Sequence, residues 1–421
     1  MREWMNRRPG TATAPHEPRH EQNRRLVSPI RTALFCAVTL LIASCATRPP
    51  ADTSGGQGGF TPVAYSALPG WGPQAAIAGL ESFTRSCRAI DVMPEDQSLG
   101  GTGTAAAEGG KAGLWRNVCA AARAVPPDDA AAAQTFFQSN LIPYQASTAA
   151  RITGYYEPVY AGSEVKLPGY DIPLYARPRN LVLANLSAFR DSTGKQRIVG
   201  RLRYGKLVPY YTRTRIESGA IARQAHVIAW LRDPVDAYMA EVQGSAELRL
   251  PDGTLIDLGF DGTNGRAYTP IGKLMVEKGY LAANDVSAPS ISAWLRAHPA
   301  QASGLMDANK NYVFFKRVRD VPDGLGAPGA LGVPLTPEGS VAVDEKAIPL
   351  GAPVFIATKT LDRLTTAQDI DVGAKGASAA QIFFGLGDRA AQRAGAMDEV
   401  GSLYVLLPRP VAAAPSTGAS S

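Results

Sequence analysis

The stretch RITGYYEPVYAGS, residues 151–163, is where the pattern of the sequence changes. Before it, apolar side chains recur at helical spacing over residues 74–90, 114–124 and 128–140. After it come short runs of alternating apolar and polar residues, interrupted by Gly, Pro and Asp, which are typical of strands. The sequence therefore predicts N-terminal helices followed by a mainly β body.

One hairpin within the β body is well defined by its turn. Residues 246–250 and 254–260 are predicted to pair around Pro251-Asp252-Gly253, because an Asp-Gly step favours tight hairpin turns. The other predicted strands are residues 152–156, 172–175, 226–231, 238–242, 312–318, 340–343, 354–357, 382–384 and 402–407.

Two helices are predicted inside the β body. One begins at Pro270, after an N-cap at Thr269, and ends at Gly279. The other covers residues 291–297. The Gly- and Ala-rich residues 97–111 are predicted to form a loop within the helical region.

The N-terminus resembles an export signal. A basic segment precedes an apolar run at residues 33–43, which is too short to span a bilayer. The run ends in LIASC, which resembles a bacterial lipobox whose Cys45 would carry lipid; a plain signal peptide with an accidental cysteine is the alternative. We expect a signal peptide over residues 1–45, a flexible tether over residues 46–72 and a disordered tail over residues 411–421.

Composition excludes several classes of function. The 421 residues carry a formal net charge of +6, part of it in the predicted signal, so no nucleic-acid footprint remains. Beyond the signal, His226 and His298 are the sole imidazoles, and neither zinc motifs nor a P-loop occur, so no metal or cofactor is predicted. Cys87 and Cys119 are either a disulfide, which an oxidising compartment permits, or two buried thiols.

Isolated carboxylates in Gly-rich or aromatic surroundings are the candidates for acid–base chemistry on a sugar bond. They are Glu157 in GYYEP, Asp261 in FDGTNG and Asp369 in AQDIDVGAKG. Each has a structural alternative, because Asp and Asn beside Gly commonly form turns. Aromatic residues that could stack on sugars, or belong to the core, are Tyr155, Tyr156, Tyr210, Tyr211 and Tyr268.

Taken in order, the motifs are similar to those of one family, the membrane-bound lytic murein transglycosylase A group, glycoside hydrolase family 102. They cover residues 75–408, and their order is more specific than any one of them. The motifs are ITGYYEP (152–158), PYYTR (209–213), IESG (216–219), VQGS (242–245), DGTNGRAYTPIG (261–272), YVFF (312–315), VPLT (333–336), IPLG (348–351), AQD (367–369), FFG (383–385) and RAG (393–395).

The resemblance implies two domains with a deep groove between them. One would be a double-psi β-barrel with the N-terminal helices, made of residues 73–159 and 304–410. The other would be an inserted β-barrel-like domain, residues 160–303. The predicted strands and helices are compatible with this arrangement, but they do not by themselves give the barrel topology.

The resemblance also implies a peptidoglycan lytic exotransglycosylase, which cleaves the β-1,4 bond between N-acetylmuramic acid and N-acetylglucosamine. Asp369 matches the single catalytic aspartate of the family, by its place after Ala367-Gln368 and before Lys375. This carboxyl would protonate the glycosidic oxygen and then accept the proton of the muramoyl C6 hydroxyl, which attacks C1 to leave a 1,6-anhydro end. Neither water nor a second carboxylate is required, in contrast to ordinary glycosidases. The pKa of Asp369 would have to be raised, so that its carboxyl is protonated at the working pH.

Two departures from the family pattern leave alternatives open. Ile370, Asp371 and Val372 replace the usual Thr-Gly-Gly, so a shifted alignment would make Asp371 the acid or a helper. Gln381 stands where the family often has an acidic residue, which leaves a weakly active or inactive peptidoglycan-binding lipoprotein as an alternative; a hydrolytic glycosidase is another. The expected substrate contacts, each with a structural role as the alternative, are Tyr155, Tyr156, Glu157, Gln243, Gly244, Ser245, Thr263, Asn264 and Lys375.

The expected partners are peptidoglycan glycan strands, the membrane through lipidated Cys45, and cell-wall synthases. The expected location is the periplasm, with the lipid in the outer membrane. The sequence leaves open exo or endo action, peptide-stem preference and the choice between inner and outer membrane.

Overall fold

The computed structural model describes residues 60–189, 197–371 and 373–410. The predicted signal peptide with Cys45, most of the predicted tether and the predicted tail lie outside these residues. Within them, no helix has both the length and the apolar character needed to cross a bilayer.

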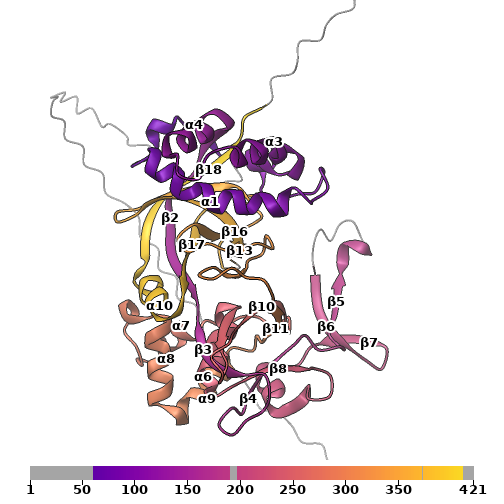
Figure 1. Cartoon of the computed structure of the whole chain (residues 1–421). Coiled ribbons are helices and arrows are strands. Elements are labelled where there is room, and N and C mark those ends of the chain that lie inside the picture. Colours follow the sequence, from indigo (N-terminus) through magenta and orange to yellow (C-terminus); the bar gives the residue numbers. More distant parts are fainter. Residues whose placement is uncertain (1–59, 190–196, 372, 411–421) are drawn as a thin grey trace, which may run out of the picture. The chain divides into compact units, whose positions relative to one another are not determined.

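One part of the fold is a closed barrel of six strands (Figure 1). Around the barrel, β2 pairs with β17, followed by β14, β16, β15 and β18, which pairs with β2 again. The pairs β2–β17 and β14–β16 are parallel and the other pairs are antiparallel. The strands are β2 (Leu141–Glu157), β14 (Ser340–Val343), β15 (Pro353–Ala357), β16 (Asp362–Ile370), β17 (Ala379–Leu386) and β18 (Asp398–Pro408).

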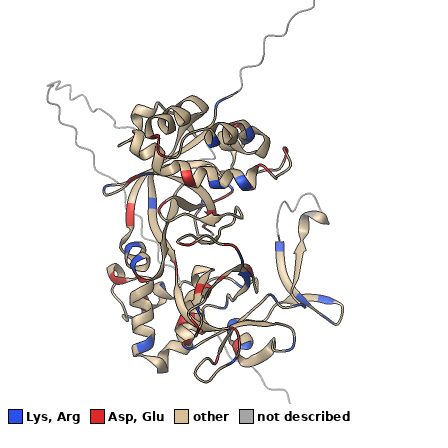
Figure 2. Cartoon of the chain, in the orientation of Figure 1, with Lys and Arg blue, Asp and Glu red and all other residues tan. Residues whose placement is uncertain are grey.

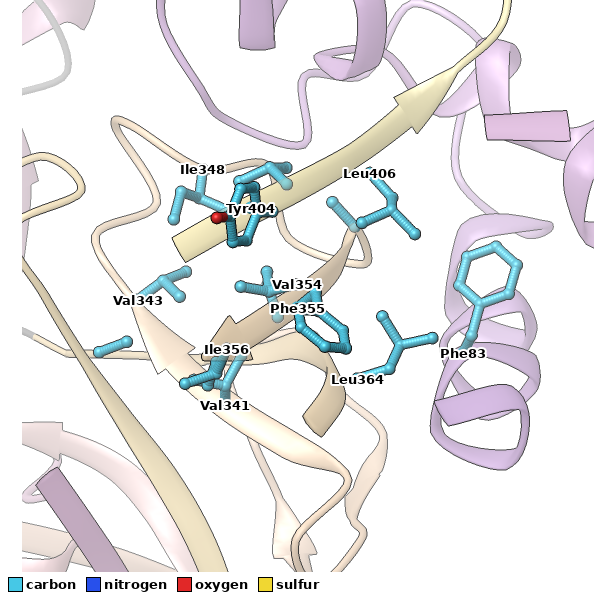
Figure 3. Close-up of a cluster of buried hydrophobic side chains, with 14 of the residues drawn as sticks. Phe83, Val341, Val343, Ile348, Val354, Phe355, Ile356, Leu364, Tyr404 and Leu406 are labelled. Atoms are coloured by element: carbon cyan, nitrogen blue, oxygen red, sulfur yellow. The ribbon is translucent and has the colours of Figure 1, made fainter. Parts of the chain in front are cut away.

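Apolar side chains of the barrel strands form one continuous core with the N-terminal helices (Figure 3). Helix α1 (Pro73–Ile90) packs on β16, where Gly79 leaves room for Leu364: a Cβ at Gly79 would lie 2.5 Å from that side chain. Phe83 of α1 packs against aromatic rings of α3 (Ala112–Arg123) and α4 (Ala130–Asn140). The helices therefore extend the barrel core rather than forming a separate domain.

A disulfide joins Cys87 in α1 to Cys119 in α3. Reduction is expected to lower the free energy of unfolding by about 3–4 kcal/mol, because the bond closes a loop with a sequence separation of 32 residues in the unfolded chain. Urea unfolding of the oxidised protein, the reduced protein and the Cys87→Ser/Cys119→Ser variant measures this. Equal midpoints for all three would contradict the prediction.

A second sheet begins directly after β2, since the chain passes through Pro158 into β3. Its strand order is β11-β10-β9-β3-β8-β4, and β9 and β10 form the predicted hairpin. Buried apolar residues such as Leu231, Leu248 and Phe315 form its core. The strands are β3 (Val159–Ser163), β4 (Ile172–Tyr175), β8 (Val227–Leu231), β9 (Ala246–Arg249), β10 (Leu255–Thr263) and β11 (Val313–Val318).

Helices connect this second sheet to the barrel. Helix α6 packs on α8 and also contacts β2, while α8 contacts α10, which lies against β2. Tyr238, Met239 and Leu295 belong to the apolar cluster of these helices. The helices are α6 (Pro234–Gln243), α7 (Ile271–Glu277), α8 (Ala288–Ala297), α9 (Pro299–Ala308) and α10 (Gly387–Ala396).

A three-stranded sheet, β5-β6-β7, contains several Lys and Arg residues, coloured blue in Figure 2. Val199 of this sheet lies close to Gly265, and the guanidinium of Arg201 lies 4.2 Å from the ring centroid of Tyr211. The strands are β5 (Val182–Asn185), β6 (Arg197–Arg203) and β7 (Lys206–Pro209). The remaining short elements are β1 (Thr61–Pro62), η1 (Tyr65–Ala67), α2 (Gly103–Gly109), η2 (Leu186–Ala188), α5 (Arg213–Arg215), η4 (Ile216–Ala220), η5 (Ala283–Asp285), β12 (Gly326–Pro328) and β13 (Pro334–Leu335).

The prediction of a mainly β fold with N-terminal helices needs correction as a description of the whole chain, because helical and strand residues are about equally numerous in its described part. Residues 238–242 belong to helix α6 instead of a strand: Asp233 caps its N-terminus, Pro234 is its first residue and Gly244 ends it in the left-handed conformation. Helix α10 also interrupts the β region predicted after Tyr312.

Two predicted irregular segments are partly ordered. Within the predicted loop 97–111 the structure contains helix α2, because its alanines favour a helix and Ala105 is buried. Within the predicted tether 46–72, strand β1 pairs with β2 and Leu68 is buried. Residues 60–72, which the sequence assigned to the tether, therefore belong to the folded body.

Candidate active site

The carboxyl group of Asp369, near the end of β16, is held by three hydrogen bonds. The backbone N–H groups of Ala330 and Ile370 donate to Oδ1 at 3.0 and 2.9 Å. The hydroxyl of Tyr155, on β2, donates to Oδ2 at 3.2 Å. Because Oδ1 already accepts two N–H bonds, a proton on this carboxyl belongs on Oδ2.

Burial raises the pKa of Asp369 above its ordinary value. The hydrogen bonds from Ile370, Ala330 and Tyr155 act in the opposite direction, and the charge of Asp371 raises the pKa further. Burial, followed by the charge of Asp369, also holds the pKa of Tyr155 well above its ordinary value. The site thus contains a shielded acid beside a phenol that stays neutral.

Gln368, the residue before Asp369, fixes this end of β16 to helix α1. Its side chain is fully buried; Nε2 donates to the carbonyl of Ser82 and to Oγ of Ser86, both at 2.8 Å, and Oε1 accepts from Ser340. Sequence reasoning gave Gln368 no role of its own. The available signal was a polar side chain within an apolar strand, together with two serines at helical spacing in α1.

Asp371, two residues after Asp369, forms hydrogen bonds within a turn. Its Oδ1 accepts the N–H of Gly373 at 2.7 Å, and its carbonyl accepts the N–H of Ala374, which is the pattern of an Asp-initiated turn. The side chain of Lys375, in the same turn region, is exposed. The geometry therefore favours Asp369 over Asp371 as the acid.

A cavity of about 280 Å³ lies where β2 and α10 face α6 and α8. Three predicted substrate contacts line it: Tyr155, Tyr156 and Gln243. Asp369 is not in its wall, but Tyr155 links the two, because it lines the cavity while its hydroxyl contacts Asp369. We take the carboxyl of Asp369 as the centre of the candidate site, because the residues that line the cavity include no carboxyl held by a similar set of hydrogen bonds.

Glu157 is fully buried, so the structure corrects its assignment as a direct substrate contact. Its Oε2 accepts the N–H of Ala327 at 2.6 Å. Burial raises the pKa of Glu157 to about 8. By contrast, Gly244 at the end of α6 has open space around its Cα, and its neighbour Ser245 is partly exposed.

The motif DGTNG has a structural role. Asn264 is fully buried and donates through Nδ2 to the carbonyls of Tyr211 and Lys310. Thr263 accepts the N–H of Gly265 through its hydroxyl, within the same turn. The structure therefore corrects the assignment of Asn264 to the substrate, because its polar atoms are used to hold neighbouring backbone segments.

Asp261, a third candidate acid, lies 3.7 Å from the guanidinium of Arg177, measured between Oδ2 and Nε. The structure does not bring it into hydrogen-bond contact with Asp369 or Tyr155.

Gln381 lies in the same cross-strand row as Asp369. It pairs with Ala342 on β14, which pairs in turn with Asp369 on β16. Two strand spacings, about 10 Å, separate the two backbones, and directly paired residues share a face of the sheet. The neutral amide adds no charge there, and Asp371 is the residue whose negative charge raises the pKa of Asp369.

In the described part of the chain, no group of three or more His, Cys, Asp or Glu side chains is placed to hold a metal ion. The candidate site in the barrel is instead the carboxyl of Asp369, which accepts two backbone N–H groups on Oδ1 and the Tyr155 hydroxyl on Oδ2. The fold combines a closed barrel with a second sheet, and the site contains a single carboxyl that can act as an acid and as a base. Together they define an enzyme that uses acid–base catalysis.

Comparison with known proteins identifies the family. Residues 151–316 match the domain family described as MltA specific insert domain, and residues 339–407 match the 3D domain family. The crystal structure of MltA from Neisseria gonorrhoeae is similar, with a TM-score of 0.69 and 30% identity over 84% of this chain and 93% of that one. The chain therefore belongs to the membrane-bound lytic murein transglycosylase A family.

Two Escherichia coli comparisons agree with this placement. Membrane-bound lytic murein transglycosylase A of that organism is 28% identical over 273 residues, which cover 62% of this chain and 66%, just under two thirds, of that protein. The structure of E. coli MltA with bound chitohexaose shares the fold, with a TM-score of 0.62 and 23% identity over 84% of this chain and 96% of that one.

Proposed function

We propose that this protein is a peptidoglycan lytic transglycosylase. It cleaves the β-1,4 bond between N-acetylmuramic acid and N-acetylglucosamine and leaves 1,6-anhydromuramoyl ends. The single observation that carries the proposal is the geometry of Asp369, a partly buried carboxyl with a raised pKa whose Oδ1 is occupied by two N–H donors. Such a group can carry a proton on Oδ2 and deliver it to a leaving oxygen.

Asp369 acts twice in the proposed reaction. First, Oδ2 gives its proton to the glycosidic oxygen as the bond to C1 of the muramoyl residue breaks. The Ala330 and Ile370 N–H groups then stabilise the carboxylate that forms. Next, Oδ2 takes the proton of the muramoyl C6 hydroxyl while that oxygen bonds to C1, which closes the anhydro ring and restores the acid.

Tyr155 keeps the reactive oxygen of Asp369 in place. Its hydroxyl donates to Oδ2 when the carboxyl is charged, and its high pKa prevents it from acting as a competing base. Asp371, the nearby acidic residue, accepts the N–H of Gly373 within its own turn and is not assigned a role as nucleophile. The reaction uses Asp369 alone, without the second carboxylate of ordinary glycosidases.

Glycan binding is proposed for residues that line the cavity and for other residues of the sequence motifs. The E. coli relative whose structure contains chitohexaose supports a sugar-binding groove in this fold. Tyr156 and Gln243 line the cavity, Gly244 and Ser245 follow α6, Thr263 ends β10, and exposed Lys375 follows Asp369. These residues are the proposed contacts with the peptidoglycan strand.

The barrel is proposed to be a double-psi β-barrel. The two parallel pairs, β2–β17 and β14–β16, within an otherwise antiparallel closed barrel support this topology. The proposed domains are residues 73–159 with 304–410, and residues 160–303, because β2 leads directly into the second sheet at Pro158. Strand β11 (Val313–Val318) is an exception to these boundaries: it pairs with β10 and so belongs with the second sheet.

Export and lipid attachment at Cys45 are proposed from the sequence of the N-terminus, which would place the enzyme in the periplasm on the outer membrane. The name membrane-bound, which the E. coli relative carries, supports a place in the cell envelope. Cell-wall synthases are proposed as protein partners on the sequence resemblance alone.

The function is tested with the protein lacking residues 1–45, incubated with purified sacculi, and mass spectrometry of the released muropeptides. We expect 1,6-anhydro ends. Reducing ends would show a hydrolytic glycosidase instead, and no release, with retention on sacculi, would show a binding protein without activity.

Tyr155→Phe is expected to lower kcat by about 3–10-fold, because one hydrogen bond to the carboxylate is lost. That bond lowers the pKa of Asp369, so its removal raises this pKa and moves the alkaline fall of activity to higher pH. The pH profile of anhydromuropeptide release measures both effects. A shift to lower pH, or an unchanged kcat, would contradict the assigned contact.

A further inference from the structure

Glu157 occupies the crossing from the barrel into the second sheet. It is the last residue of β2, and β3 begins two residues later, after Pro158. Its side chain is fully buried, with Oε2 2.6 Å from the N–H nitrogen of Ala327. At Gly326 a Cβ would lie 2.9 Å from Oε2 and 2.4 Å from the ring of Phe383, so the backbone of this segment passes close to the carboxyl.

The segment that Glu157 holds is also the segment that supplies an N–H group to Asp369. Ala327 donates to Glu157, and three residues later Ala330 donates to Oδ1 of Asp369 at 3.0 Å. Between and beyond them, Gly329 donates to the carbonyl of Val333, and Leu331 donates to the carbonyl of Gln368. Residues 326–331 are therefore fixed at both ends, by Glu157 at one and by the Gln368-Asp369 strand at the other.

We propose that Glu157 is a positioning residue for catalysis: its carboxyl holds residues 326–331 so that the N–H of Ala330 stays on Oδ1 of Asp369. It touches no substrate, because it is buried, and acts through the backbone between Ala327 and Ala330. This inference rests on the proposed transglycosylase function and explains how a buried glutamate belongs to the site.

The surroundings of Glu157 favour its neutral form. Its pKa is raised to about 8, chiefly by burial; the Ala327 N–H and the Ser245 hydroxyl lower it, while the charges of Asp257 on β10 and Glu247 on β9 raise it. Tyr155, on its own strand, is a neutral phenol. Among the described residues Oε1 has no hydrogen bond of normal geometry, which a neutral acid tolerates better than a charged carboxylate.

Protonation of Glu157 therefore keeps the segment in place, and ionisation displaces it. Above about pH 8 the carboxyl acquires a charge in a site with two acidic neighbours. A buried charge without a partner is strongly unfavourable. The segment packed on Glu157 therefore moves away, and water reaches the charged carboxyl. Residues 326–331 then shift, and Asp369 loses the N–H of Ala330 that stabilises its charged form.

The test compares Glu157→Gln, Glu157→Ala and wild type as the chain lacking residues 1–45, by kcat and KM for anhydromuropeptide release between pH 5.5 and 9.5. Glu157→Gln, which keeps a neutral oxygen acceptor for Ala327, should stay within about 3-fold of wild type at pH 6.5. Its activity relative to wild type should rise at least about 5-fold between pH 6.5 and pH 9. Glu157→Ala should lose at least about 10-fold in kcat with little change in KM.

Taking the ratio of variant to wild type removes the pH dependence of Asp369 itself, which both proteins share. The exposed Glu345→Gln serves as the matched control and should follow wild type at every pH. A flat Glu157→Gln ratio would overturn the inference even if Glu157→Ala does not fold. A folded Glu157→Ala with wild-type kcat would also overturn it. Wild type without any anhydro product would instead refute the proposed function.

Discussion

Replacement of Asp369 by Asn is expected to lower the rate of anhydromuropeptide release by at least about 10³-fold. The amide oxygen of Asn can still accept the N–H groups of Ala330 and Ile370, so the local geometry survives. The amide nitrogen, however, can neither deliver a proton to the glycosidic oxygen nor take one from the C6 hydroxyl. The loss should therefore appear in kcat, with little change in KM or in the free energy of unfolding.

The matched variant is Asp371→Asn, two residues along the chain. It removes the charge that raises the pKa of Asp369, so the pKa of Asp369 falls and the alkaline fall of activity moves to lower pH. On the acidic side of that fall the activity should stay within about 3-fold of wild type, because the variant leaves the catalytic carboxyl itself in place. An inactive Asp371→Asn together with an active Asp369→Asn would reverse the assignment of the acid.

Arg213→Met is expected to lower the free energy of unfolding by about 3–5 kcal/mol, the largest stability effect that we foresee. Arg213 is almost completely buried and pairs with Glu241 of α6 through two nitrogens, at 3.3 and 2.8 Å. It also donates to the carbonyls of Asn309 and Asn311. Its removal leaves a buried carboxylate and two backbone carbonyls without their partner.

Thermal and urea unfolding measure this effect, with the exposed Arg215→Met as the control that should match wild type. The double variant Arg213→Met/Glu241→Leu should recover part of the loss, because no unpaired charge stays buried. Equal stability of Arg213→Met and wild type would show that the pair contributes nothing. A double variant less stable than Arg213→Met would contradict the buried-charge explanation.

Local chemistry made much of the secondary structure predictable. The hairpin around Asp252-Gly253 and the helix α1 follow from turn preference and apolar spacing, which act over a few residues. Helix α6 was missed because Tyr238–Val242 alternates like a strand. Its real signals were Asp233, Pro234 and Gly244 at its two ends. At this segment the capping residues of α6, rather than the alternation of apolar residues, indicated the correct secondary structure.

The candidate site was predictable only in part. The motif AQD singled out Asp369, but the partners that hold its carboxyl come from Ala330 and Tyr155, distant in sequence and brought together by strand pairing. Glu157 and Asn264 were predicted to contact substrate because they stand in the family motifs, with a structural role as the alternative. Both are fully buried, and each binds neighbouring backbone instead, which only the tertiary structure could reveal.

The most direct test of the account is the fate of solvent oxygen during cleavage. Sacculi are digested by wild-type protein in oxygen-18 water, and the new glycan ends are analysed by mass spectrometry. If Asp369 serves as acid and then as base toward the C6 hydroxyl, the new muramoyl ends are 1,6-anhydro and contain no oxygen-18. New reducing ends that contain oxygen-18 would show that water is the nucleophile and would contradict the account.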